Sequence, residues 1–481
     1  MVRNMRVLFS KPDAKNVFRM VGGLRERKWL KDILPNRTEV DLGLLYVATA
    51  LDRAGHETVL FDTQLSRNAI PEFIEAIRRF KPDLVALNGI TGFVQDAAEM
   101  ADEVKKHFGI PVVLGGHHAT ALPQMTLEQF SSIDYAVSGE GEITAVELLE
   151  AMQGARTFDS VDGLTWRDGD KIVVNRSRVP IKDLDALPFP DRTKVRNELY
   201  HPNLNDYVSL PSTNVSSSRG CPHRCTFCAR TGARLPVGMN MRSPENVLEE
   251  IRKCQRVFGI HDIRFVDDTV TNDRDRMVKF CETLIRVNYN ITWSCYSCPN
   301  EVDPELLALM KKSGCFLVKY GIETGSDEML RKMKKGFTVA DARNAVKWTR
   351  EARIECFSGW IIGMPGETPE QIDRTIDFAV EISPDVSVFA SLALFPGSII
   401  FKQMYDGGHI LHYDWRHYLD TCTPTYDHEL PGEVLNDKVL GAFRRFYLRP
   451  SFIWQKIKRF FLGGHPVREV RNIVLGFVDL L

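Results

Sequence analysis

The chain has 481 residues, enough for two or three domains with large cores. Lys and Arg total 62 against 63 for Asp and Glu, so there is no general attraction to nucleic acid, and no nucleic-acid partner is expected. Hydrophobic residues make up 44% and charged residues 26%, which excludes wholesale disorder. No uninterrupted apolar run predicts a membrane span, and the first residues are typical of a strand, not of a signal peptide. With scattered cysteines and no export signal, a cytoplasmic location is expected.

The first third of the chain alternates short apolar runs with amphipathic stretches. Strands are predicted at residues 6–9, 58–62, 84–88, 111–114 and 135–137, with helices at about 43–54, 71–80 and 96–108. This alternation is typical of a doubly wound parallel sheet, whose ligands bind at the carboxyl ends of the strands. We therefore assign residues 1–154 to a Rossmann-like domain of the α/β class.

Glycine-rich turns follow three of these predicted strands, where a ligand would bind. Glycine lets a ligand approach the backbone closely, and small polar side chains can hydrogen-bond it. The candidate contact residues are Asn88, Gly89, Thr91, Gly115, Gly116, His117, His118, Thr120, Gly139, Glu140 and Gly141. The alternative is that these residues only form the turns.

A second strand–helix alternation begins near Asn214. Before it, residues 155–212 are predicted as a linker that contains a small hairpin at 162–175. The six predicted strands are 215–217, 263–266, 291–294, 316–320, 357–362 and 386–394, and the helices are 244–258, 273–287, 303–313, 327–333, 339–352 and 369–382. Six such units predict a partial (β/α)6 barrel over residues 213–400, followed by a C-terminal helical region at 401–481.

Three cysteines, Cys221, Cys225 and Cys228, lie together directly after the first predicted barrel strand. Three thiolates on one loop can hold three irons of a [4Fe–4S] cluster and leave the fourth iron open. A zinc site would need a fourth ligand, for which His223 is the candidate. Cys295 and Cys298 form a separate Cys-x-x-Cys pair on the third predicted strand, which is typical of barrel packing.

The cysteine loop and three later segments, 265–269, 320–326 and 360–367, resemble the radical S-adenosylmethionine (SAM) superfamily. The resemblance implies that the open iron binds SAM. It also implies that one electron cleaves SAM to a 5′-deoxyadenosyl radical, which takes hydrogen from an unactivated carbon. The SAM-contacting residues that it implies are Phe227, Asp267, Asp268, Glu323, Ser326 and Gly363. The two aspartates stand where the superfamily often has a Gly-Gly-Glu stretch.

A doubly wound domain before such a barrel resembles the cobalamin-binding subclass, which contains methyltransferases and the anaerobic magnesium-protoporphyrin cyclase. The resemblance implies that the glycine-rich turns hold cobalamin, although no Asp-x-His-x-x-Gly motif supplies a cobalt ligand. The implied cofactors are a [4Fe–4S] cluster, SAM and cobalamin, with a flavodoxin or ferredoxin as electron donor. The leading hypothesis is methyl transfer to an unactivated carbon of a lipid-like or secondary-metabolite substrate. The alternatives are radical cyclisation or rearrangement, a methylthiotransferase acting on tRNA or protein, and a non-catalytic iron–sulfur or cobalamin sensor.

The C-terminal tail interleaves aromatic with basic residues between 443 and 462, and a second apolar segment follows at 467–481. This pattern is typical of a helix that rests on an anionic membrane surface. It predicts a hydrophobic substrate reached from the inner membrane surface, with peripheral membrane contact. The alternative is that both helices only cover the open side of the barrel.

Overall fold

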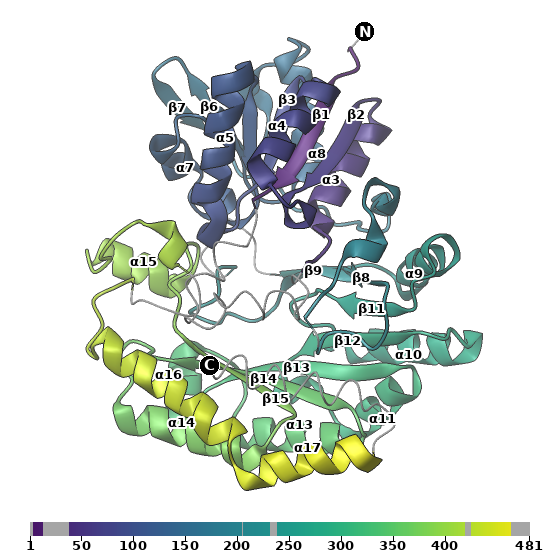
Figure 1. Ribbon diagram of the computed structural model, residues 1–481, viewed down its shortest axis with the longest axis vertical. Coiled ribbons are helices and arrows are strands. Elements are labelled where there is room, and N and C mark those ends of the chain that lie inside the picture. Colours follow the sequence, from purple (N-terminus) through teal and green to yellow (C-terminus); the bar gives the residue numbers. More distant parts are fainter. Residues whose placement is uncertain (1–2, 13–37, 204, 231–237, 419–424, 463–481) are drawn as a thin grey trace.

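The structure is a computed structural model that describes residues 3–12, 38–203, 205–230, 238–418 and 425–462, the side chains of the last six of these residues excepted. Two α/β units are stacked along the longest axis of the molecule, with the N-terminal sheet at one end and the barrel at the other (Figure 1). The predicted segment 467–481 lies outside the described residues.

The N-terminal unit is a doubly wound sheet, as predicted. Its parallel strands lie in the order β2 (Glu57–Asp62), β1 (Arg6–Lys11), β3 (Leu84–Asn88), β4 (Val112–Gly115) and β5 (Tyr135–Val137). Alternate residues of β1 enter different cores, because successive strand side chains point to opposite faces. The helices are α3 (Leu42–Arg53), α4 (Ala69–Phe80), α5 (Val94–Phe108), α6 (His117–Ala121), α7 (Pro123–Gln129) and α8 (Gly141–Met152).

The hairpin placed in the linker by the sequence forms as β6 (Leu164–Asp168) and β7 (Lys171–Val174). Strand β6 pairs antiparallel with β5, so the hairpin extends the N-terminal sheet to seven strands. Farther along, Arg192 is buried and its guanidinium lies 2.7 Å from the carboxylate of Glu250 in the barrel unit. The segment between the sheets is therefore packed against its neighbours.

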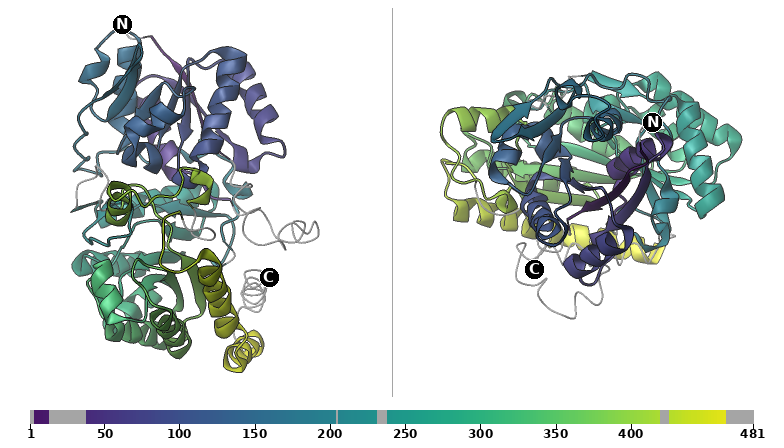
Figure 2. Two further views of the ribbon diagram at one scale, coloured as in Figure 1. Left: turned by 90° about the vertical axis from the view of Figure 1, so that its left-hand side faces the viewer. Right: turned by 90° about the horizontal axis from the view of Figure 1, so that it is seen from above.

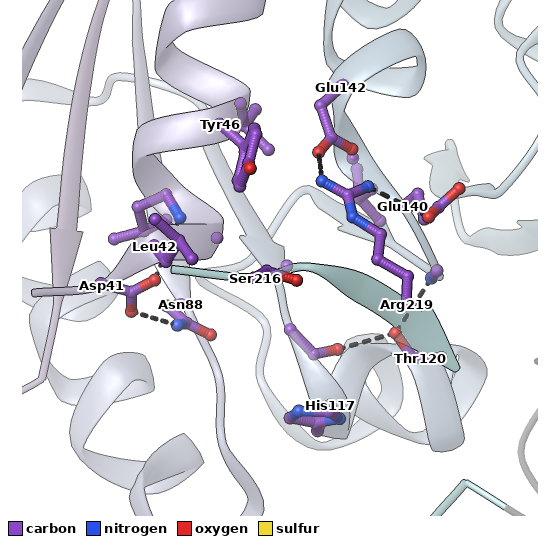
Figure 3. Close-up of a pocket in the computed structure, with 18 of the residues that line it drawn as sticks. Asp41, Leu42, Tyr46, Asn88, His117, Thr120, Glu140, Glu142, Ser216 and Arg219 are labelled. Carbon is purple, nitrogen blue, oxygen red and sulfur yellow. Dashed lines mark hydrogen bonds and ion pairs between the residues drawn. The ribbon is translucent and has the colours of Figure 1, made fainter. Parts of the chain in front are cut away.

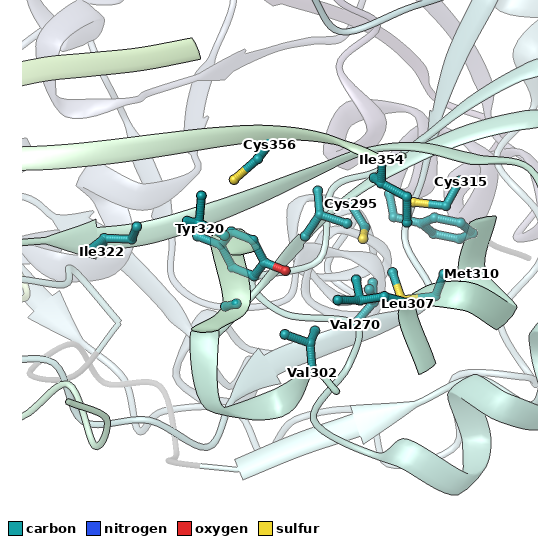
Figure 4. Packing of buried hydrophobic residues seen from close by; sticks show 14 of the residues in the cluster. Val270, Cys295, Val302, Leu307, Met310, Cys315, Tyr320, Ile322, Ile354 and Cys356 are labelled. Carbon is teal, nitrogen blue, oxygen red and sulfur yellow. The ribbon is translucent and has the colours of Figure 1, made fainter. Parts of the chain in front are cut away.

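The second unit has six parallel strands in the order β15 (Val386–Ser391), β14 (Glu355–Ile362), β13 (Cys315–Glu323), β12 (Thr292–Ser297), β11 (Asp262–Phe265) and β8 (Ser212–Val215). It is thus a partial barrel of the predicted size. Its helices are α9 (Pro244–Phe258), α10 (Arg274–Val287), α11 (Pro304–Lys312), α12 (Asp327–Met333), α13 (Val339–Glu351) and α14 (Pro369–Ile382). Cys295, Cys315 and Cys356 are buried among apolar side chains of this core (Figure 4).

The chain beyond the barrel returns to the N-terminal unit and then turns back. After α15 (Ile399–Asp406), the buried Trp415 packs its ring edge against His118, with centroids 4.8 Å apart, and its Nε1–H donates to Gln129. One buried cluster therefore contains residues of both units and of this segment, which lies between them in Figure 2. Helix α16 (Gly432–Tyr447) then packs along β15, and α17 (Pro450–Leu462) follows.

Among the helices that the structure describes, none has both the length and the apolar character needed to cross a bilayer.

Candidate functional site

One cavity of about 1200 Å³ lies between the two units. Turns after β3, β4 and β5 line one side of it, and residues that follow β8 and β11 line the other. Its volume exceeds the range of roughly 300–1,000 Å³ typical of small-ligand pockets. Figure 3 shows Asn88, His117 and Thr120 from the first side and Ser216 and Arg219 from the second around this space. A large ligand or two smaller ones can therefore contact both units at once.

The predicted ligand-contacting turns largely meet at this cavity. Those that line it are Asn88, Gly115, Gly116, His117, Thr120, Gly139, Glu140 and Gly141. Gly89 and Thr91 lie behind the lining. His118 faces the other way, into the core beneath Trp415, and burial lowers its pKa to about 3, which keeps the imidazole neutral.

The turns after β3 and β4 contact each other at Gly116. This residue has φ +99°, and a Cβ there would lie 2.3 Å from the Asn88 side-chain oxygen and 3.0 Å from the Gly89 carbonyl oxygen. The amide of Asn88 in turn donates to Asp41, whose carboxylate also caps the first turn of α3 at Leu44. Only glycine fits at this contact. Because it has no side chain, a large cofactor can approach the backbone of these turns closely.

Two further residues shape the same wall. The hydroxyl of Thr120 donates to the Gly116 carbonyl oxygen at 2.8 Å and accepts from the Gly139 N–H at 3.0 Å. His117 projects into the cavity, where burial and the nearby charge of Arg230 lower its pKa. A neutral imidazole at this place can accept a hydrogen bond from a ligand or contact a metal centre.

Arg219, which sequence reasoning missed, joins the two units across the cavity. It lies on β9 (Ser218–Cys221), and its guanidinium forms ion pairs with Glu140 at 3.0 Å and Glu142 at 2.5 Å. It also lies 4.9 Å from the ring centroid of Tyr46. Burial lowers the pKa of Arg219, but the two carboxylates outweigh this effect and raise it, so the side chain stays charged. The partners are about 80 residues apart, so no local pattern reveals them.

The cysteine loop starts at the end of β9, which pairs with β10 (Gly238–Met241). Gly220 has φ +96° and lies so close to the Gly238 carbonyl oxygen that a Cβ would be 2.2 Å from it. Within the loop, the Cys228 N–H donates to the Cys225 carbonyl oxygen, and the Thr226 N–H donates to that of Met333. These contacts fix the backbone that carries the three thiols.

The three thiols share one site. Burial, aided by the charges of Asp268, Cys225 and Cys228, raises the pKa of Cys221 to about 11, although a backbone hydrogen bond at His223 lowers it. Burial likewise raises the pKa values of Cys225 and Cys228. Such a group favours a strongly charged metal centre that displaces the thiol protons, and three thiols on one loop fit three irons of a cluster. The Nε2 atom of His223, the candidate fourth ligand of a zinc site, lies 2.8 Å from a carboxylate oxygen of Glu301.

The predicted SAM-contacting aspartates occupy different positions. Asp267 is buried and accepts hydrogen bonds from the N–H and hydroxyl of Ser217 and from the hydroxyl of Ser218. Burial raises its pKa. Asp268 lies at the cavity wall, 2.7 Å from Arg230. Asp268 is therefore the more accessible of the two carboxylates.

The other predicted SAM-contacting residues lie along the barrel, outside the lining of the large cavity. Glu323, at φ +70°, forms an ion pair with the buried Lys335 at 3.2 Å, and Lys335 lies 5.5 Å from the ring centroid of Phe227. Ser326 caps α12 at Met329. The Gly363 N–H donates to Glu367, and burial raises the pKa of that carboxyl to about 7.

Comparisons with known proteins agree with this arrangement. Residues 215–379 match the radical SAM superfamily, and residues 36–149 match the B12 binding domain. An uncharacterised methyltransferase of Pyrococcus horikoshii is 29% identical over 86% of this chain and 89% of its own length. The anaerobic magnesium-protoporphyrin IX monomethyl ester cyclase of Cereibacter sphaeroides is 30% identical over 84% of this chain and 66% of its own length.

The fold has a counterpart among solved structures. The radical SAM methyltransferase TsrM from Kitasatospora setae, solved with cobalamin and a [4Fe–4S] cluster bound, aligns with a TM-score of 0.69. The alignment covers 93% of this chain and 90% of TsrM at 18% identity. Both units of the present chain therefore occur together, in the same overall architecture, in another protein.

Proposed function

Since the chain belongs to the cobalamin-binding radical SAM enzymes, we propose that it transfers a methyl group to an unactivated carbon of a hydrophobic small molecule. Its cofactors are a [4Fe–4S] cluster, SAM and cobalamin. The observation that carries the proposal is the single cavity that touches Cys221 and Asp268 on one side and the glycine-rich turns on the other. Cofactors held on the two sides would face each other across one shared space.

In this proposal each unit holds its own cofactors. Cys221, Cys225 and Cys228 hold the cluster, and Asp268 and Glu323 contact SAM. The turns around Asn88, Gly116 and His117 hold cobalamin. When bound, the cofactors supply the electron, the methyl group and the radical that an unactivated carbon requires.

The chain's own residues position and shield that chemistry. Arg219 ties the cobalamin-side turn at Glu140 to the strand that ends in Cys221. The buried Lys335–Glu323 pair places one positive charge beside Cys225. Apolar residues such as Phe9, Leu44 and Leu84 form part of the cavity wall and exclude water from it. A hydrophobic substrate suits this wall, and a flavodoxin or ferredoxin suits the need for single electrons.

The test is anaerobic reconstitution with iron, sulfide and cobalamin, followed by incubation with a one-electron reductant and SAM that carries a deuterated methyl group. Expected products are 5′-deoxyadenosine, S-adenosylhomocysteine and, with a lipid extract as substrate source, a molecule heavier by one labelled methyl. Replacing Cys221, Cys225 or Cys228 by Ala should abolish the cluster absorbance and SAM cleavage. Cys281→Ala, at a buried thiol of the barrel core, is the control and should keep both. SAM cleavage that survives in all three loop variants would contradict the proposal.

Radical cyclisation is the second candidate, because the relative with 30% identity is named a cyclase. It requires the same cofactor sites but a product with an unchanged carbon count. Product mass therefore separates the two reactions: an added labelled methyl supports methyl transfer, and a mass difference without a methyl supports cyclisation.

A further inference from the structure

The two cysteines of the Cys-x-x-Cys pair point to different places. Cys295 lies within β12 and is 1% exposed in the barrel core. Cys298 follows the end of β12, is half-buried, and lies beside the cysteine loop. Its Sγ is 3.2 Å from Nε2 of His223, the residue between Cys221 and Cys225 in the chain. Only one member of the pair therefore belongs to barrel packing.

The sulfur of Cys298 is held in place by hydrogen-bond donors. The residue caps the short helix Pro299–Glu301, so its side chain accepts from the backbone N–H of Glu301. The Nε2 atom of His223 approaches the sulfur from the loop side. These two contacts hold the sulfur on the side of β12 that meets the cysteine loop.

Glu301 fixes the imidazole of His223. Its carboxylate accepts from His223 at 2.8 Å, from Thr271 at 2.8 Å, and from the Thr269 hydroxyl, and it also accepts from the N–H of Cys298. Its oxygens are thus already engaged by protein donors. The three potential ligand atoms of His223, Cys298 and Glu301 lie within 4.8 Å of one another.

The Cys298 thiol lies near the loop, since its Sγ contacts His223, which stands between Cys221 and Cys225 in the chain. Burial raises the pKa of Cys298, the charges of Glu301, Cys221 and Cys225 act in the same direction, and the charge of Lys335 lowers it. The same Lys335 interacts with Cys225. A fourth thiol is therefore present where the loop alone supplies three.

We propose that Cys298 is a fourth thiolate ligand of the cluster, bound to the fourth iron in the absence of SAM and displaced when SAM binds. His223 and Glu301 are its positioning residues. Coordination releases the thiol proton to solvent, and displacement by SAM returns a proton to the sulfur, so no electron is transferred. This inference rests on the proposed function, because it requires the cluster.

The test compares wild-type protein with Cys298→Ala and Cys298→Ser, and uses Cys295→Ala as the matched control. Each full-length protein is reconstituted anaerobically without SAM, oxidised briefly with ferricyanide and examined by electron paramagnetic resonance. An iron without a protein thiolate is lost first on oxidation, which leaves a three-iron cluster with its own signal. Wild type and Cys295→Ala should give a several-fold smaller three-iron signal than either Cys298 variant. His223→Ala should give an intermediate signal at unchanged iron content before oxidation.

SAM binding gives a second measurement. Removal of a competing ligand should make SAM bind Cys298→Ala several-fold more tightly than wild type, as followed by the change in the spectrum of the reduced cluster. Equal three-iron signals and equal SAM affinity in wild type and Cys298→Ala would overturn the inference and leave the proposed function intact. If wild type itself assembles no cluster, the proposed function fails, and this inference fails with it.

Discussion

A side chain at position 116 has no room in this fold. The backbone there is left-handed, which costs a residue other than glycine about 1–2 kcal/mol, and the Asn88 and Gly89 oxygens fill the space where a Cβ would lie. Gly116→Ala should therefore displace the turn after β3. We expect cobalamin affinity to fall on the order of tenfold, measured by absorbance titration, with the iron content of the cluster unchanged.

Gly109→Ala is the matched control for that variant. Gly109 also has a left-handed backbone, at φ +64°, but no heavy atom lies within 4 Å of the position that a Cβ would take, and it ends α5 outside the cavity lining. It should lose similar stability and keep its cobalamin affinity. An equal loss of affinity in both variants would show that backbone strain, and not the contact with Asn88, is responsible.

At the scale of whole elements, local signals predicted the barrel helices well, whereas α6, α7 and α8 of the N-terminal unit were not predicted. Helices α9, α12 and α14 have the predicted bounds, because Ser243, Ser326 and Thr368 cap them and proline opens two of them. Strand β8 was displaced: residues 215–217 were predicted, but the strand is Ser212–Val215. Its polar residues are buried by distant partners, such as Asn214, which donates to the Val40 carbonyl oxygen. Hydrophobic periodicity cannot reveal a strand of this kind.

In the candidate site, too, local sequence signals predicted some residues, and long-range contacts determine the others. The sequence identified the three loop cysteines and most of the turns at the cavity, because glycine and cysteine spacing is local. It could not separate His117 from His118, since the partner that buries His118 is Trp415, about 300 residues later. Nor could it separate Cys295 from Cys298, because the loop that meets Cys298 lies 75 residues earlier. In both pairs, long-range packing determines which residue is buried in a core and which one lies at the site.

The predicted membrane contact can be tested by substitutions in helix α17. Its Phe452 and Lys456 are buried against the protein, whereas Ile453 and Trp454 are 42% and 68% exposed. If these two residues enter a bilayer surface, Ile453→Ser with Trp454→Ser should weaken co-sedimentation with anionic vesicles on the order of tenfold or more. Val257→Ser, at an exposed position of α9, is the control and should bind like wild type. Wild-type protein that ignores anionic vesicles would contradict the prediction.

At the scale of the whole molecule, Trp415 anchors the segment that follows the barrel on the N-terminal unit. Its ring is fully buried against His118, which neighbours the cavity residue His117, so its loss should loosen one wall of the cavity. Trp415→Ala should lower the free energy of unfolding by about 3–5 kcal/mol, measured by denaturant unfolding, and weaken cobalamin binding while the cluster is retained. Trp454→Ala removes an exposed ring and should change neither property. Unchanged cobalamin affinity in Trp415→Ala would show that this contact does not support the cavity.

The return of residues 392–418 to the N-terminal unit also has a consequence for the synthesis of the protein on the ribosome. The surface around His118 and Gln129 is complete once α8 has emerged, yet its covering ring, Trp415, is synthesised more than 260 residues later. At roughly 5–20 residues per second, this apolar face stays open for roughly 15–50 s during translation. Throughout that interval the nascent chain exposes an apolar surface to which chaperones and neighbouring chains can bind. The wall of the cavity beside His118 is covered by Trp415 only near the end of synthesis.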